Sequence, residues 1–186
     1  MSVADKVFSL ILVLAAALHS CQAAAAQDIK HIRLPDTDAN LPGAGPIRRY
    51  DWFRNLWEER RTRFSKQQQA DRNAVVFLGD SITQGANDDF LGLFPGLKIA
   101  NRGISGDTTR GMLLRLEDDV LTVEPKAIVI LAGTNDLEEG AAPDVIAANV
   151  QLILAQIAKG RPETPVVLCL VFPSSASKKR PAESIK

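Results

Sequence analysis

The stretch Val75-Val76-Phe77-Leu78-Gly79-Asp80-Ser81-Ile82-Thr83-Gln84-Gly85 begins as an apolar run and stops at Gly-Asp-Ser. A short run rich in Val, Phe and Leu, ended by a glycine, is typical of a buried strand in a parallel sheet. In open parallel sheets, ligands bind beyond the carboxyl ends of the strands. Ser81 follows such an end, so its hydroxyl is a candidate nucleophile. The alternative is that Asp80 and Ser81 only cap a helix.

Further apolar runs alternate with amphipathic segments along the chain. We predict strands at residues 74–78, 98–100, 127–132 and 166–172, and helices at residues 50–64, 109–120 and 143–160. The first helix carries an aromatic stripe at helical spacing, which we interpret as core packing rather than as a ligand-binding patch; it consists of Tyr50, Phe53, Trp57 and Phe64. The alternation predicts an α/β fold, a doubly wound parallel sheet in three layers.

The composition is that of a globular chain. Its 186 residues carry a formal net charge of zero and are 46% hydrophobic. No basic stripe with interleaved aromatic residues is present, so we expect no nucleic-acid partner. Of the two cysteines, Cys21 lies near the N-terminus and Cys169 lies in an apolar run, where we expect a core residue and no disulfide.

The N-terminus has the layout of a secretory signal. The apolar block at residues 7–18 is shorter than the roughly 20 residues that span a membrane, and small residues follow it up to Ala26. We expect a signal peptide at residues 1–26, a turn-rich linker at 27–48 and one domain at 49–186. The protein would then be secreted or periplasmic. The alternatives are an uncleaved anchor, or a lipoprotein tethered to a membrane through a lipid on Cys21.

Three polar turns follow the first three strands, and they carry Ser81, Gly106 and Asn135. Right-handed crossovers bring these turns to one edge of the sheet. Acyl transfer needs a nucleophile and donors that face the developing oxyanion. Ser81 supplies the hydroxyl, the backbone N–H groups of Ser81 and Gly106 can face the pocket, and the Asn135 amide is a neutral third donor. We interpret Asp80, Asp107, Arg110 and Asp136 as caps or loop-ordering residues.

Three segments resemble conserved blocks of a known family. Residues 79–82, 101–106 and 133–136 resemble the first three blocks of the SGNH (GDSL-type) hydrolases, with Ile82 in place of the usual Leu. The resemblance implies that Ser81 is the nucleophile, that Gly106 and Asn135 complete the oxyanion hole and that Asp80 supports the site. It also implies a flavodoxin-like sheet of order 2-1-3-4-5 and a small acyl-ester substrate. We expect no cofactor and no metal.

The sequence departs from this family in one respect. The family carries its catalytic Asp and His in an Asp-x-x-His block after a fifth strand, whereas this chain has only His19 and His31, both before the predicted domain. We therefore expect a chain truncated before the last strand and helix. Such a chain would have weak activity, because nothing activates Ser81. It would also self-associate, because its fourth strand forms an open apolar edge.

The leading hypothesis is an exported serine esterase or acylhydrolase that cleaves small acyl or acetyl esters of carbohydrate or lipid. The first alternative is a non-catalytic module of the same fold that binds acyl or carbohydrate ligands. A second alternative treats residues 79–85 as the phosphate loop of a flavin-type protein, but it leaves the turn at residues 133–136 without a role.

Overall fold

The computed structural model describes residues 32–171. Within this range, the chain forms a compact unit that begins at Leu34. The predicted signal peptide, Cys21, His19 and His31 all lie outside the described residues, as does everything after residue 171. No helix in the described range is both long and apolar enough to cross a membrane.

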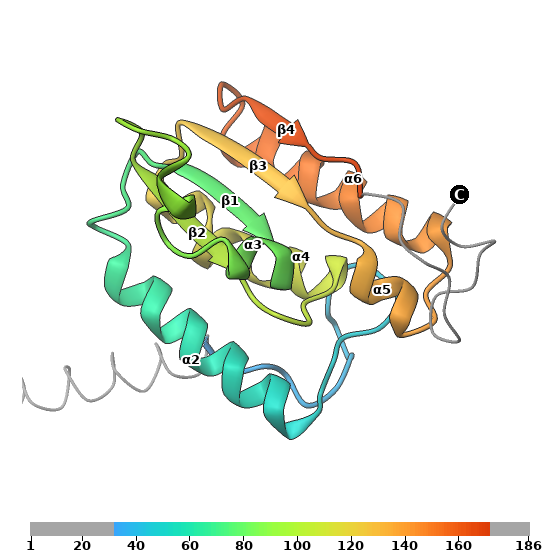
Figure 1. Ribbon diagram of the computed structural model, residues 1–186. Coiled ribbons are helices and arrows are strands. Elements are labelled where there is room, and N and C mark those ends of the chain that lie inside the picture. Colours follow the sequence, from blue (N-terminus) through green and yellow to red (C-terminus); the bar gives the residue numbers. More distant parts are fainter. Residues whose placement is uncertain (1–31, 172–186) are drawn as a thin grey trace, which may run out of the picture. The chain divides into compact units, whose positions relative to one another are not determined.

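Four parallel strands form the sheet, and their arrowheads point the same way in Figure 1. They are β1 (Val75–Gly79), β2 (Ile99–Gly103), β3 (Ala127–Leu131) and β4 (Val166–Leu168), in the order β2-β1-β3-β4. Gly79 lies opposite both Gly103 and Leu131, so β2, β1 and β3 end at the same level. This arrangement confirms the α/β class and the strand order predicted for the first four strands.

Two long helices cover one face of this sheet. These are α4 (Thr109–Asp119) and α6 (Pro143–Gly160), which pack on each other and on the alternate strand residues that are fully buried. One face of α4 is buried, with Met112, Leu113 and Leu116 in the core together with Val120, which follows the helix. The opposite face of the sheet is less covered in the described chain, where the Phe77 ring packs on those of Phe90 and Phe94.

A second core lies beneath α2 (Asp51–Gln67), where Phe53, Trp57 and Phe64 are buried as predicted. Tyr50 differs from the prediction, because it is 54% exposed. The helix begins one residue later, and Tyr50 is its extended N-cap, so its ring turns outward and stacks on the Trp52 ring at 6.3 Å.

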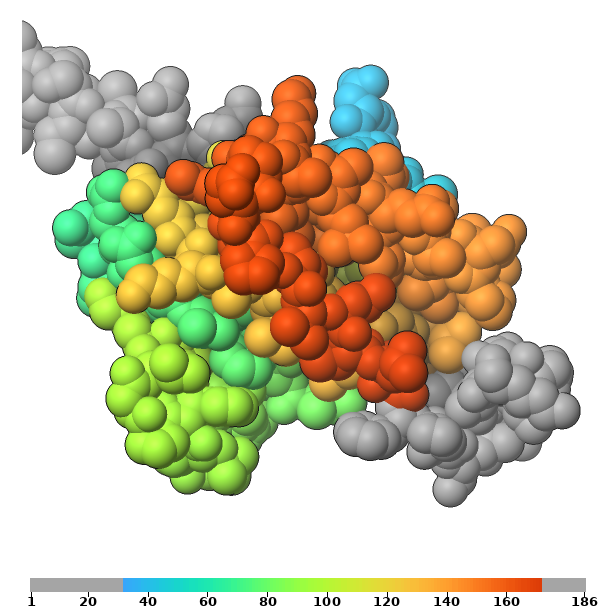
Figure 2. Space-filling model, turned by 90° about the horizontal axis from the view of Figure 1, so that it is seen from above, coloured from blue at the N-terminus to red at the C-terminus, as the bar shows by residue number. Residues whose placement is uncertain are grey.

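Two strands differ in length from the prediction. Strand β2 continues to Gly103, since the backbone we assigned to a loop keeps its register with β1. Strand β4 ends at Leu168, four residues early, and its side chains at Val167 and Leu168 are exposed. Figure 2 shows this orange-to-red end of the chain on the molecular surface. Cys169 is consequently a half-buried free thiol rather than a core residue.

Residues 34–48 differ from the linker we predicted, because they are fastened to the domain. The Asn149 side chain on α6 accepts from the Ala44 N–H at 3.1 Å and donates to the Ala44 carbonyl at 2.9 Å. Arg110 on α4 donates to the carbonyls of Pro42 and Gly45. The compact unit therefore includes this segment, and its boundary lies at 34 rather than 49.

Candidate active site

Ser81 opens the short helix α3 (Ser81–Gly85) directly after β1. Asp80 is the N-cap, buried, and its Oδ1 accepts the Ile82 N–H at 3.0 Å, so the predicted capping role of Asp80 is confirmed. Ser81 itself is exposed. As the first residue of a helix it has no intrahelical acceptor for its N–H. The serine thus presents a hydroxyl and an N–H at the carboxyl end of the sheet.

Gly106 lies in the loop that follows β2, with a φ of +87°. A Cβ there would meet a Trp52 ring carbon at 2.7 Å and Arg48 Nη1 at 3.0 Å, so the position requires glycine. The loop is tied to the Ser81 turn, because the Ile104 N–H donates to the Gly79 carbonyl at 3.1 Å. Within residues 32–171, no acceptor takes the Gly106 N–H.

Asn135 lies in α5 (Thr134–Glu138), which follows β3. Its Nδ2 donates to the Asp107 carbonyl at 2.9 Å and to Asp80 Oδ2 at 3.2 Å. One acceptor is the neighbour of Gly106 and the other is the neighbour of Ser81. The structure therefore brings the three predicted residues to one edge of the sheet. In Figure 1, α5 lies beyond the tip of β3 at this edge. The catalytic roles of the three residues stay predictions.

The surrounding carboxylates hold the loops in place. Asp107 Oδ2 accepts from Arg115 Nε at 2.8 Å, and its Oδ1 accepts the Thr108 N–H. Burial raises the pKa of Asp107 to about 7, against the lowering effect of Arg115. Asp136 accepts from both the N–H and the hydroxyl of Thr109, and burial raises its pKa as well. Burial likewise raises the pKa of Asp80.

Sequence reasoning missed two arginines that contact these loops. Arg115 is fully buried and donates to the Gly79 and Arg102 carbonyls at 3.3 and 2.8 Å, so it joins the ends of β1 and β2. In the sequence, its position between two leucines of α4 was the only indication that Arg115 is buried. Arg48 donates to Asn135 Oδ1 at 3.1 Å. In the sequence, nothing distinguishes Arg48 from the other polar residues of a turn-rich segment that we expected to be a linker.

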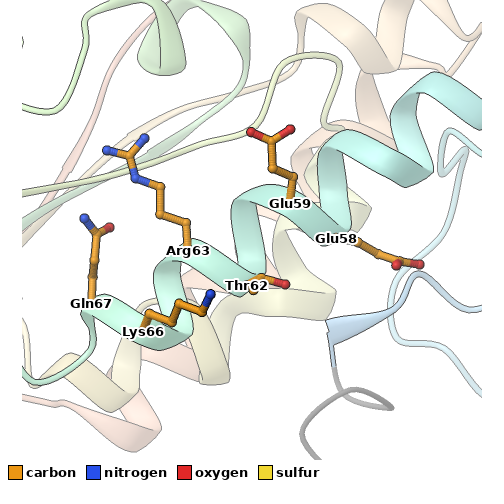
Figure 3. A pocket seen from close by; sticks show the side chains of 6 residues that line it. All are labelled: Glu58, Glu59, Thr62, Arg63, Lys66 and Gln67. Carbon is orange, nitrogen blue, oxygen red and sulfur yellow. The ribbon is translucent and has the colours of Figure 1, made fainter.

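The surface of the described chain has several hollows, and two of them differ in character. One follows the outer side of α2, where Figure 3 shows only polar and charged side chains; they are Glu58, Glu59, Thr62, Arg63, Lys66 and Gln67. The other is apolar, has a volume of about 160 Å³ and adjoins the turn that carries Asn135, with Gly133, Leu137 and Ile146 in its wall. Among the described residues, no cluster of His, Cys, Asp or Glu could hold a metal ion.

A parallel sheet with a serine, a glycine and an asparagine at the ends of three successive strands defines the chain as an α/β protein with a hydrolase-like site. Residues 77–185 match the GDSL-like lipase/acylhydrolase family. The chain belongs to this hydrolase family, as the sequence motifs predicted.

Solved structures agree with this assignment. A GDSL-like lipase from Bacteroides thetaiotaomicron is 29% identical, with a TM-score of 0.55 over 67% of this chain and 64% of that one. An acylhydrolase from Bacteroides fragilis is 27% identical, with a TM-score of 0.58 over 73% of this chain and 66% of that one.

Among curated proteins, the human platelet-activating factor acetylhydrolase IB subunit alpha2 is 32% identical over 120 residues. The match covers 63% of this chain and 52% of the relative. The bovine alpha1 subunit is 30% identical over the same length, covering 51% of that protein. The chain thus matches about half the length of these relatives.

Proposed function

We propose that this protein is a serine esterase that transfers an acyl group from a small ester to water. Ser81 Oγ attacks the carbonyl carbon and loses its proton to a base. The oxyanion forms beside the Gly106 N–H and takes an Asn135 N–H in place of Asp80 Oδ2, the longer of the two bonds from that amide at 3.2 Å. Collapse of this intermediate expels the alcohol, which takes up a proton, and water then releases the acid from the acyl-serine. The supporting observation is the pair of bonds that tie Asn135 to the neighbours of Ser81 and Gly106.

The base for this reaction is not among the described residues. The sequence contains two histidines, His19 and His31, and neither falls in the range 32–171. A serine hydroxyl without an adjacent base is a weak nucleophile. We therefore propose that the 186-residue chain alone turns over esters slowly, and that a small external base accelerates it.

For the substrate, we propose an acetyl or other short acyl ester of a carbohydrate or lipid, met outside the cytoplasm after export. The acetylhydrolase relatives support a short acyl group, and so does the small apolar hollow beside the Asn135 turn. Export rests on the layout of residues 1–26.

The test is the hydrolysis of p-nitrophenyl acetate by the purified chain, with and without imidazole as the external base. Imidazole cleaves this ester by itself, so the matched control is Ser81→Ala at the same imidazole concentration. We expect an imidazole-dependent rate above that of the Ser81→Ala protein. Equal rates for the two proteins would contradict the proposed function.

A non-catalytic binding module is the second candidate, and the lack of a histidine in the described range favours it. Equilibrium dialysis distinguishes the two functions. A binding module would retain an acetylated sugar or a short-chain lipid ester in equilibrium dialysis and return it intact. An esterase would release the free acid.

A further inference from the structure

Arg48 makes three separate contacts at the candidate site, one from each of its nitrogens. Its Nη1 donates to Asn135 Oδ1 at 3.1 Å, its Nε to Glu139 Oε1 at 2.6 Å and its Nη2 to Glu138 Oε2 at 2.9 Å. Its side chain is only 9% exposed. A guanidinium with all three nitrogens engaged has a fixed position and orientation.

The same guanidinium also lies against the second oxyanion loop. A Cβ built on Gly106 would be 3.0 Å from Arg48 Nη1, so the Arg48 nitrogen occupies the space beside Gly106. Arg48 therefore bonds Asn135 and lies beside Gly106, the two residues that would bind the oxyanion. It reaches them from the segment before α2, which the sequence presented as a linker.

The contact with Asn135 has a chemical consequence. The Asn135 carboxamide donates through Nδ2 to Asp107 and Asp80, and the Arg48 bond satisfies its oxygen. A hydrogen bond from a charged donor is about twice as strong as a neutral one. Electron withdrawal at the amide oxygen makes the amide N–H groups better donors, since hydrogen bonds in a chain polarise one another.

Burial opposes the charge on Arg48, but the hydrogen bonds that it donates to the carboxylates of Glu139 and Glu138 outweigh burial and raise the pKa of Arg48. The group is therefore a permanent cation. Glu138 and Glu139 hold it in place from the end of α5 and beyond, the same turn that presents Asn135.

We propose that Arg48 is a positioning residue of the oxyanion hole: it fixes and polarises the Asn135 amide and supports the Gly106 loop. This inference rests on the proposed function for its catalytic consequence. The arrangement of Asn135 that it predicts can be measured without any turnover.

The experiment that needs no activity follows the side-chain NH₂ signals of Asn135 by ¹H–¹⁵N NMR in the full 186-residue chain. Asn135→Ala identifies the signals by their loss. In Arg48→Met, we expect the Asn135 NH₂ signals to shift and to exchange faster with water. Arg49→Met is the matched control, because the neighbouring Arg49 bonds Pro35 and Asp38 instead. Unchanged Asn135 signals in a folded Arg48→Met protein would overturn the proposal.

Arg48→Lys provides a second variant if Arg48→Met does not fold. Lysine keeps the charge but lacks the planar fork that serves three acceptors, so the Asn135 signals should shift in this variant too. Signals identical to wild type in Arg48→Lys would equally overturn the proposal.

The catalytic arm measures kcat and KM for p-nitrophenyl acetate with imidazole. Direct loss of an oxyanion donor costs about 10²–10³ in kcat. We expect Arg48→Met to lower kcat by about 10-fold to 10²-fold with KM within twofold, and Arg49→Met to match wild type. A raised KM with unchanged kcat would contradict the role in the oxyanion hole. No turnover in wild type would contradict the proposed function, while the NMR arm would still decide the Arg48 arrangement.

Discussion

Among single residues, Asp107 is a carboxylate whose ionisation is opposed by burial. It is fully buried beside Gly106, and burial raises its pKa to about 7 although Arg115 lies 2.8 Å from its Oδ2. A carboxyl with a raised pKa holds its proton longer in the folded state than in the unfolded state. Its contribution to stability is then fully present below about pH 4 and is lost as the pH rises through 7.

Asp107→Asn tests this reasoning. The variant keeps an acceptor for Arg115 but has no proton to lose, so its free energy of unfolding should depend less on pH between 4 and 7. The wild type should lose stability relative to the variant over this range, by at most about 1.4 kcal/mol per pH unit. Urea unfolding at pH 4, 5, 6 and 7 measures the difference. Parallel curves for the two proteins would show that the Asp107 pKa is not raised.

The residues that the motifs named are those that the structure brings together. Ser81, Gly106 and Asn135 each follow a strand, and a parallel sheet aligns strand ends, so their meeting could be predicted. Arg48 and Arg115 could not be predicted to lie there, because their contacts span 87 and 36 residues of sequence. Only the folded chain shows which backbone carbonyl or amide a long side chain reaches.

At the scale of elements, the segment at residues 34–48 is the main difference from the prediction. Its prolines and glycines are typical of a loop, and the structure shows a loop there. However, Asn149 and Arg110 bind the backbone of this loop. Asn149 is a buried polar residue on the otherwise apolar inner side of α6, and nothing in the sequence indicated that it binds this segment. The lengths of β2 and β4 were also predicted wrongly. They depend on pairing with the neighbouring strand and on position at the edge of the sheet, and not only on the length of the apolar run.

Asn149→Ala should release this segment. The change removes two bonds to Ala44 and one to the Thr109 hydroxyl. A hydrogen bond of this kind contributes about 0.5–1.5 kcal/mol net, so the combined loss should cost about 1–3 kcal/mol. Urea unfolding gives the loss in stability. Gln151→Ala is the matched control on the exposed side of α6 and should stay within about 0.5 kcal/mol. A loss no larger than in the control would mean that Asn149 does not fasten the segment.

For the whole molecule, the outermost strand β4 is the feature from which we predict behaviour in solution. Within the described residues, β4 pairs only with β3. Its exposed apolar side chains continue past the strand, with Val167 54% and Leu170 89% exposed. An exposed apolar edge strand can pair with another chain. Self-association stays a prediction, and this edge is the surface at which we expect it.

A lysine on this edge should reduce self-association, because charged side chains disfavour edge-to-edge pairing. We expect Val167→Lys to remain monomeric at concentrations where the wild type forms larger species, as measured by sedimentation velocity. Leu91→Lys is the control: Leu91 is 68% exposed in the helix η1 (Phe90–Gly92), away from the strand. Equal effects of both lysines would indicate a general effect of charge rather than edge pairing.

The central claim is that Ser81 is a nucleophile held beside an oxyanion hole. Its most direct test is the mass of the Ser81 peptide after reaction of the protein with a fluorophosphonate in the presence of imidazole. The account predicts a phosphonyl adduct on Ser81, absent in Ser81→Ala and formed about 10²–10³-fold more slowly in Asn135→Ala. An unlabelled Ser81, or labelling at the same rate in Asn135→Ala, would contradict it.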